Sequence, residues 1–429
     1  YKEAELATRK AIELKPDYPL AYSNLGGILR DLGKLEDAEF ANRKAIKLNP
    51  NNAEAYSNLG SILRDLGKYK EAELATRKAI ELKPDYPLAY SNLGEILRAF
   101  GKFKEAELAT RKAIELNPNN AEAYTNLGSI FIDLGKFKEA ELATRKAIEL
   151  NPNNAEGYLN LGIVRRDLGK FKEAELATRK AIELKPNFSN AHRNLSICLY
   201  LLKDIDSALK SIIKANSLNN KDILNKLLFS IYETEKIKKQ KPINTTKKFK
   251  KKSSVPNTLI FNLPVDSKLI NTLYKFQIRD QEIYQGPTYG DAKGSNYKLF
   301  EKHDKNIQNI KDKLITIAKD SVESEIFVSE SFFTIFRSGG GLKSHDHLGP
   351  IDKIIGLNIA SKKFSLVYYI DVGDQNCEDP GILKLENPNQ DILPSNGLVI
   401  IFPAKRKHSV FYKGQKDRII IGINFYKLS

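Results

Sequence analysis

Residues 103–136 read FKEAELATRKAIELNPNNAEAYTNLGSIFIDLGK, and copies of this unit fill the first half of the chain at a period of 34 residues. The copies begin at Tyr1, Leu35, Tyr69, Phe103, Phe137, Phe171 and Ile205. Each copy holds two segments with apolar residues at helical spacing, mostly separated by a proline, which ends a helix, and mostly closed by a Gly-Lys pair. One such helix pair cannot bury its apolar face, so we expect an all-α superhelix of six to seven stacked repeats over residues 1–220.

A fixed set of positions carries a family pattern within each unit. In the second copy and the helix before it, these positions are Tyr22, Leu25, Gly26, Ala38, Ala45 and Pro50. Their spacing resembles the tetratricopeptide-repeat (TPR) family. One departure is the polar residue, Thr8 or Asn42, where that family usually has an aromatic side chain, and looser local packing is expected there. The repeat then decays, and residues 221–235 read as an amphipathic helix that caps the array.

A ladder of asparagines is the candidate binding surface of the repeats. It consists of Asn24, Asn58, Asn92, Asn126, Asn160 and Asn194. The resemblance places this position on the concave groove, where amide donors and acceptors can pair with an extended peptide. A second stripe of Arg30, Arg64, Arg98 and Arg166 could attract acidic segments. The alternative is that both stripes are solvated polar residues copied with each duplicated unit.

Charge, cysteine content and the length of apolar runs bear on the partners and the cellular location of the chain. Residues 236–255 form a lysine-rich linker, and nine lysines between 236 and 252 account for more than half of the net charge of +16. With one aromatic residue, Phe249, this segment favours a solvated linker over a nucleic-acid surface. Two distant cysteines suit a reducing, cytoplasmic (intracellular) location, and no apolar run is long enough to span a membrane. Because the chain starts inside a repeat without Met, we expect its true N-terminus upstream.

The pattern changes after Pro256, where β-branched and aromatic residues gather in short alternating segments. Helices are predicted over 267–280 and 305–320. Strands are predicted over 325–337, 363–371, 381–386, 397–402, 408–412 and 418–426. Mostly antiparallel strands in this number predict that residues 256–429 form a double-sheet jelly roll.

Polar residues of one chemical kind fall into this β pattern. The segment SHDHLG holds His345, Asp346 and His347, while His408 and Arg418 come later, ten residues apart. Three of the chain's five histidines are in this group. Imidazoles from two strand ends can occupy one face of a divalent metal and leave the other face open. An arginine inside an apolar strand needs an anionic partner, which a metal-chelating dicarboxylate would supply.

This arrangement, together with FSLVYYIDV, PGILKL and GLVIIFPAKRKHSV, is similar to the 2-oxoglutarate/Fe(II)-dependent oxygenases, in particular the prolyl-hydroxylase-like branch. The resemblance covers about 325–427. It implies that His345 and His408 bind Fe(II), that Arg418 binds the distal carboxylate of 2-oxoglutarate, and that Tyr369 donates to the same carboxylate. The family usually has His-x-Asp, but the second ligand position here is His347. Strand alternation favours His347, and an irregular backbone would present Asp346 instead.

The sequence leaves more than one class of function open. The leading hypothesis is a hydroxylase that uses Fe(II), 2-oxoglutarate and O2, with the repeats recruiting a peptide or protein substrate. The rival is a non-catalytic interaction scaffold with a degenerate jelly roll, which the His-for-Asp change supports. Sugar transfer is a third class, but residues 256–429 are short for it and show no nucleotide-binding pattern.

Overall fold

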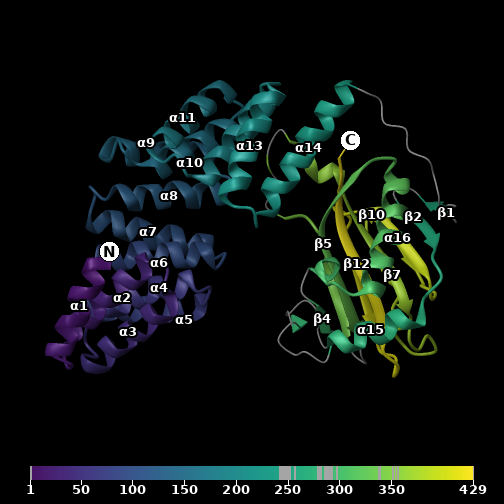
Figure 1. Ribbon diagram of the computed structural model, residues 1–429, viewed down its shortest axis with the longest axis horizontal. Coiled ribbons are helices and arrows are strands. Elements are labelled where there is room, and N and C mark those ends of the chain that lie inside the picture. The colour runs from purple at the N-terminus through teal and green to yellow at the C-terminus, as the bar shows by residue number, and fades with distance from the viewer. Residues whose placement is uncertain are drawn as a thin grey trace. The chain divides into compact units, whose positions relative to one another are not determined.

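Figure 1 shows the computed structural model of the protein. It divides into two compact units, Tyr1–Leu202 and Lys203–Ser429. The structure describes residues 2–240, 253–255, 258–277, 283–284, 293–295, 298–336, 340–349, 352, 354 and 357–428.

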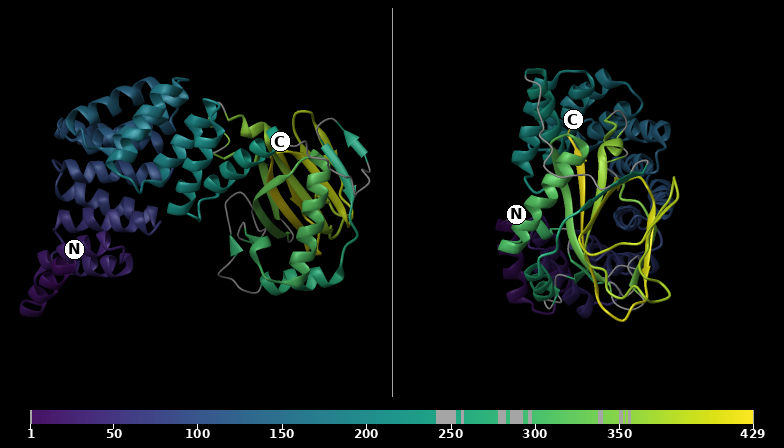
Figure 2. Two further views of the ribbon diagram at one scale, coloured as in Figure 1. Left: turned by 45° about the horizontal axis from the view of Figure 1, so that its top comes forward. Right: turned by 90° about the vertical axis from the view of Figure 1, so that its right-hand side faces the viewer.

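Fourteen helices precede the first strand in the described residues, which confirms the predicted all-α array. Successive helices lie side by side in pairs, and both views of Figure 2 show this arrangement for the first unit. In the first unit these are α1 (Lys2–Leu14), α2 (Pro19–Asp31), α3 (Leu35–Leu48), α4 (Ala53–Asp65), α5 (Tyr69–Leu82), α6 (Pro87–Ala99), α7 (Phe103–Leu116), α8 (Ala121–Asp133), α9 (Phe137–Leu150), α10 (Ala155–Asp167), α11 (Phe171–Leu184) and α12 (Ser189–Leu201). The second unit begins with α13 (Ile205–Leu218) and α14 (Ile223–Gln240).

Local sequence signals end and begin these helices. Gly33 takes a φ of 74°, a left-handed conformation that suits glycine after a helix C-terminus, and its equivalents do the same. At the N-terminus of α4, the Asn52 side chain accepts the N–H of Ala55, while α2 starts with Pro19. Where the repeat loses this glycine, Lys203 still adopts a φ of 70°.

Close packing of the two helices explains the polar residue at the usual aromatic position. Thr76 is fully buried and faces Gly60 of α4. A Cβ at Gly60 would lie 2.0 Å from Thr76 Oγ1, so no larger side chain fits opposite the threonine. The expected loosening is therefore wrong, because small residues on both helices bring them together.

The second unit contains two β-sheets whose named strands all pair antiparallel. The larger sheet has the order β1-β2-β10-β7-β12-β5-β4-β3 and the smaller one β6-β11-β8-β9. Their strands are β1 (Ser253–Val255), β2 (Thr258–Asn262), β3 (Ile283–Tyr284), β4 (Lys293–Ser295), β5 (Ile326–Phe336), β6 (Gly340–His345), β7 (Lys363–Asp371), β8 (Leu383–Leu385), β9 (Gln390–Ile392), β10 (Leu398–Pro403), β11 (His408–Tyr412) and β12 (Arg418–Lys427).

Two apolar cores lie on opposite faces of the larger sheet. On one face, α15 (Ser267–Gln277) and α16 (Lys305–Val322) pack against alternate residues of β5, β7, β10 and β12. The remaining alternate residues, such as Ile400 and Ile420, face the smaller sheet and form the second core with it. The candidate site lies on this second, inter-sheet side.

Most of the predicted boundaries agree with these elements to within two residues. Strands β1 to β4, β6 and β9 were not predicted, since they are short or begin in the glycine-rich stretch before His345. The capping helix predicted over 221–235 is α14, which continues to Gln240 and so takes in the start of the lysine-rich segment. Residues 241–252 of the predicted linker lie outside the described residues. No helix in the described parts of the chain is long and apolar enough to span a membrane.

Candidate metal centre and repeat surface

Three histidines come together where β6 meets β11. His345 ends β6 and His408 begins β11, and the two residues are register partners in the smaller sheet. His347 lies two residues beyond β6, where its backbone N–H donates to Ala404 O at 3.0 Å. The antiparallel pairing therefore brings together residues that are about sixty positions apart in the sequence.

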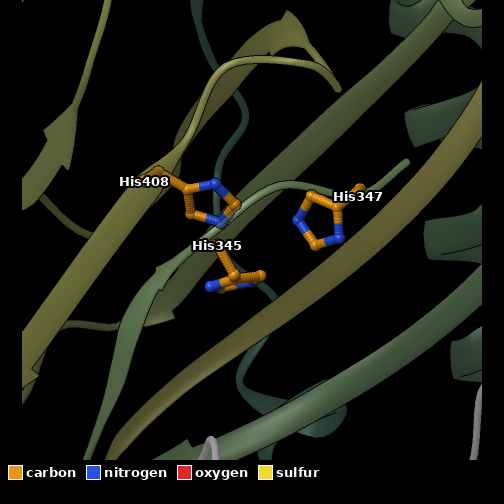
Figure 3. A group of neighbouring side chains, drawn as sticks. All are labelled: His345, His347 and His408. Atoms are coloured by element: carbon orange, nitrogen blue, oxygen red, sulfur yellow. The ribbon is translucent and has the colours of Figure 1, made fainter. Parts of the chain in front are cut away.

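The three rings surround one space, as Figure 3 shows. Ring centroids are 4.3 Å apart for His345 and His408, 4.9 Å for His347 and His408, and 5.1 Å for His345 and His347. One nitrogen from each ring lies within 4.8 Å of the others, a spacing that can hold a metal ion. Asp346 is exposed and accepts the N–H of Leu348, so it stands outside this group.

Backbone carbonyls orient two of the rings. The Nδ1–H of His345 donates to Lys343 O at 2.7 Å, and that of His408 faces Arg406 O at 3.4 Å. These contacts leave Nε2 of each ring as the lone-pair nitrogen that a metal would use.

Burial keeps two of the imidazoles, those of His347 and His408, uncharged. Burial and, second, His345 lower the pKa of His408 to about 4. Burial and the neighbouring His408 and His345 hold the pKa of His347 well below its usual value. Both rings are therefore neutral at pH 7, as metal ligation requires.

A buried ion pair holds the backbone of His347. Lys363 donates to His347 O at 2.6 Å and pairs with Asp352 at 3.1 Å, and both side chains are almost fully buried. Tyr426 donates its hydroxyl to the same carboxylate at 2.9 Å. Sequence reasoning missed these residues, although a lysine at the start of an apolar strand was a usable signal.

Asn424 holds the ring of His347. Its Nδ2 donates to His347 Nδ1 at 3.3 Å and to the Glu330 carboxylate, while its Oδ1 accepts from Ser365 Oγ at 2.7 Å. Asn424 is 1% exposed. Asn424 was not predicted either, although a polar residue inside the apolar run of β12 was a usable signal.

Arg418 lies at the start of β12 and is 1% exposed. Its guanidinium donates to the carbonyls of Pro380 and Gly381, and its Cζ lies 5.1 Å from the ring centre of Tyr369. Its Nε has no hydrogen-bond partner among the described residues, and burial lowers its pKa. A buried cation with an unused donor fits an anionic ligand.

The metal group and Arg418 lie along one face of β7. Ser365, which contacts Asn424, and Tyr369, which contacts Arg418, share that face and stand about 13 Å apart along the strand. Gly422 lies between them on β12, and the Phe332 ring covers it, 2.4 Å from where a Cβ would be.

The asparagine ladder of the repeats is partly used within the array. Asn58, Asn92 and Asn126 are half-buried, and each donates through Nδ2 to a serine of the preceding repeat. Asn160 and Asn194 are buried, whereas Asn24 is exposed. The ladder therefore joins neighbouring repeats, and its middle members retain partial access.

The arginine stripe is likewise paired with acidic residues. Arg30 pairs with Asp65 at 2.8 Å and Arg98 with Asp133 at 2.5 Å, in each case one repeat onward. Arg64 pairs with Asp65 and Glu95. Arg166 is buried and pairs with Asp167. These pairs leave little free positive charge on the stripe.

Comparison with known proteins identifies the repeats. The family model described as tetratricopeptide repeat matches residues 19–52, 53–86, 87–120, 121–154 and 155–188. No curated protein matches the chain in sequence.

Solved structures resemble the chain over about half its length. A crystal structure of the APC/C hetero-tetramer Cut9–Hcn1 is similar at 18% identity and a TM-score of 0.51, covering 54% of this chain and 46% of that one. Pseudomonas aeruginosa PilF is 20% identical with a TM-score of 0.43, covering 51% and 97%. A tetratricopeptide-repeat protein from Parabacteroides merdae is 21% identical with a TM-score of 0.45, covering 54% and 91%. The family model thus identifies residues 19–188 as an array of tetratricopeptide repeats.

Proposed function

We propose that the chain is a 2-oxoglutarate/Fe(II)-dependent hydroxylase whose repeats recruit a peptide or protein substrate. The observation that carries the proposal is the convergence of three imidazoles on the same inter-sheet side as a buried arginine with an unused donor. The order of the strands adds support. In the larger sheet the four strands β5-β12-β7-β10 lie opposite the four strands of the smaller sheet, β6-β11-β8-β9. Two facing sheets of four strands are compatible with a double-sheet jelly roll of eight strands.

The residues fit the cofactor and the cosubstrate. Nitrogens of His345, His347 and His408 would hold Fe(II) on one face, and Arg418 with Tyr369 would hold the distal carboxylate of 2-oxoglutarate. When bound, Fe(II), 2-oxoglutarate and O2 supply the oxidation that hydroxylates a C–H bond and releases succinate and carbon dioxide. The chain orients these groups, and the apolar inter-sheet core around them excludes water.

The repeats would raise the concentration of substrate beside this site. Asn58, Asn92 and Asn126 use their amide nitrogen in the described bonds, so each oxygen can accept an N–H of an extended peptide.

Two observations favour a second function, an interaction scaffold without catalysis. The histidine group includes no carboxylate, which the resembled family usually supplies. The Phe332 ring covers Gly422, midway between the metal group and Arg418.

Succinate release by the full chain with Fe(II), 2-oxoglutarate and a peptide pool distinguishes the two functions. The hydroxylase predicts turnover that is lost in His408→Ala and Arg418→Ala but kept in Asp346→Asn, the exposed neighbour. Saturable Zn(II) binding, measured by calorimetry on the same proteins, should be lost in His408→Ala only. Absence of both turnover and metal binding in the unmodified chain would favour the scaffold.

A further inference from the structure

Asn424 lies between two polar cross-strand partners, and one of them, Glu330, fixes the orientation of its amide. Glu330 on β5 and Ser365 on β7 are the cross-strand partners of Asn424 on β12. An ionised carboxylate only accepts hydrogen bonds, so the amide nitrogen must face Glu330 and the amide oxygen must face Ser365.

That orientation decides where the proton of His347 sits. The nitrogen that faces Glu330 also lies 3.3 Å from His347 Nδ1 and donates to it. A neutral imidazole that accepts at Nδ1 carries its proton on Nε2. Figure 3 shows one nitrogen of His347 directed toward His345 and His408, and since Nδ1 contacts Asn424, this is Nε2.

Metal ligation needs the opposite arrangement. A lone pair on Nε2 requires the proton on Nδ1, where it would meet the N–H of Asn424. Turning the Asn424 amide by 180° removes this clash between two N–H groups. Its oxygen then accepts from Nδ1–H of His347, and its nitrogen donates to Ser365 Oγ. The turned oxygen, however, faces the acceptor-only carboxylate of Glu330.

We infer that Glu330 and Asn424 form a latch that opposes metal binding at His347, so that Glu330 sets the metal affinity of the site. The inference rests on the proposed function only in requiring that the three histidines bind a metal. Removing a hydrogen-bond partner that supports a ligand histidine typically lowers metal affinity by about 10- to 100-fold, so removing one that opposes ligation should raise it on a similar scale.

Calorimetric titration of the metal-free full chain with Zn(II), and with Co(II) followed by its visible absorption, tests the latch. Glu330→Gln should bind about tenfold more tightly, because a glutamine amide can donate to the turned oxygen of Asn424. Glu330→Ala should also bind more tightly. Ser365→Ala is the matched control and should stay within about twofold, because a serine hydroxyl serves either orientation equally.

The outcomes separate the latch from the metal site itself. The latch would be overturned if Glu330→Gln bound Zn(II) no more tightly than the unmodified chain while the two proteins had equal melting temperatures. That result would leave the metal site intact. Binding that survives His408→Ala unchanged would overturn the metal site. Binding that appears only in the Glu330 variants would support the latch most directly.

Discussion

At the scale of single residues, His408 couples the site to pH. It is 4% exposed, and burial lowers its pKa from 6.5 to about 4. In the unfolded chain the same imidazole regains its ordinary pKa. Between pH 6.5 and about 4, the unfolded chain therefore binds a proton that the folded chain does not, and the free energy of unfolding falls as the pH is lowered.

The metal-free chain should consequently lose up to roughly 3 kcal/mol of stability through His408 between pH 7 and pH 4. Urea unfolding at each pH measures this loss. A His408→Gln variant cannot take up this proton and removes the contribution, so its stability should depend less on pH. Parallel curves for the two proteins would contradict the prediction.

A second residue-scale prediction concerns the Lys363–Asp352 pair. Asp352→Asn leaves a buried ammonium without its counter-charge and should destabilise the second unit by about 3–5 kcal/mol. Lys363→Met combined with Asp352→Leu should recover much of the stability, as measured by thermal unfolding. The double variant should still bind Zn(II) more weakly than the unmodified chain, because His347 O has lost its donor.

At the scale of elements, the contact between two helices of a repeat is close enough to exclude one methyl group. A Cβ at Gly94 of α6 would lie 2.1 Å from Thr110 Oγ1 of α7, whereas a Cβ at Gly27 of α2 would have nothing within 4 Å. Gly94→Ala should therefore destabilise the array by about 1–3 kcal/mol. Gly27→Ala should stabilise it by about 0.5–1 kcal/mol, because alanine is the better helix former.

A double-mutant cycle with Thr110→Ala tests the cause of that difference. Thr110 Oγ1 has no hydrogen-bond partner among the described residues, so its removal frees space without breaking a bond. The pair Gly94→Ala and Thr110→Ala should recover part of the loss in chemical denaturation. Additive effects of the two changes would mean that the threonine is not the obstacle.

Elements with a strong local period could be predicted from the sequence, and contacts between distant strands could not. Strands β7 and β11 have their predicted bounds, because alternation and turn residues mark them locally. The three histidines could be grouped because their order matched a known pattern. Asn424 and Glu330 are 94 residues apart in sequence, and only the register of β5 and β12 reveals that they meet.

The asparagine ladder shows the same limit within the repeats. Its period predicted one shared environment, yet Asn24 is exposed while Asn194 is 3% exposed. Burial there depends on the neighbouring repeat, as where Arg166 donates to Asn194 at 2.7 Å. A repeated residue type therefore does not guarantee a repeated role.

At the scale of the whole molecule, one helix sequence occurs in different surroundings. α1 and residues 104–116 of α7 share the sequence KEAELATRKAIEL, but α1 has no buried residue, while α7 buries Ala106, Ala109, Thr110 and Ala113. Stability in a repeat array comes mainly from contacts with adjacent repeats.

In a protein that begins at Tyr1, backbone amides of α1 should consequently exchange hydrogen at least tenfold faster than those of α7. Hydrogen exchange in α1 and α7 can be measured separately by mass spectrometry, using peptides that extend into the following helices, where the two sequences differ. Equal protection of both helices would contradict the role of neighbouring contacts, since intrinsic propensity is the same for both.

The same identity has a consequence for folding. Because α5, α7, α9 and α11 also contain KEAELATRKAIEL, a first helix of one repeat can dock on the second helix of another with nearly the native contacts. During refolding at high concentration, we therefore expect two kinds of misfolded product: chains whose repeats pack out of register, and chains that exchange repeats with one another. Among the described residues of this array, a buried arginine–asparagine bond of this kind joins only Arg166 of α10 and Asn194 of α12, so it can discriminate the correct alignment from its shifted competitors.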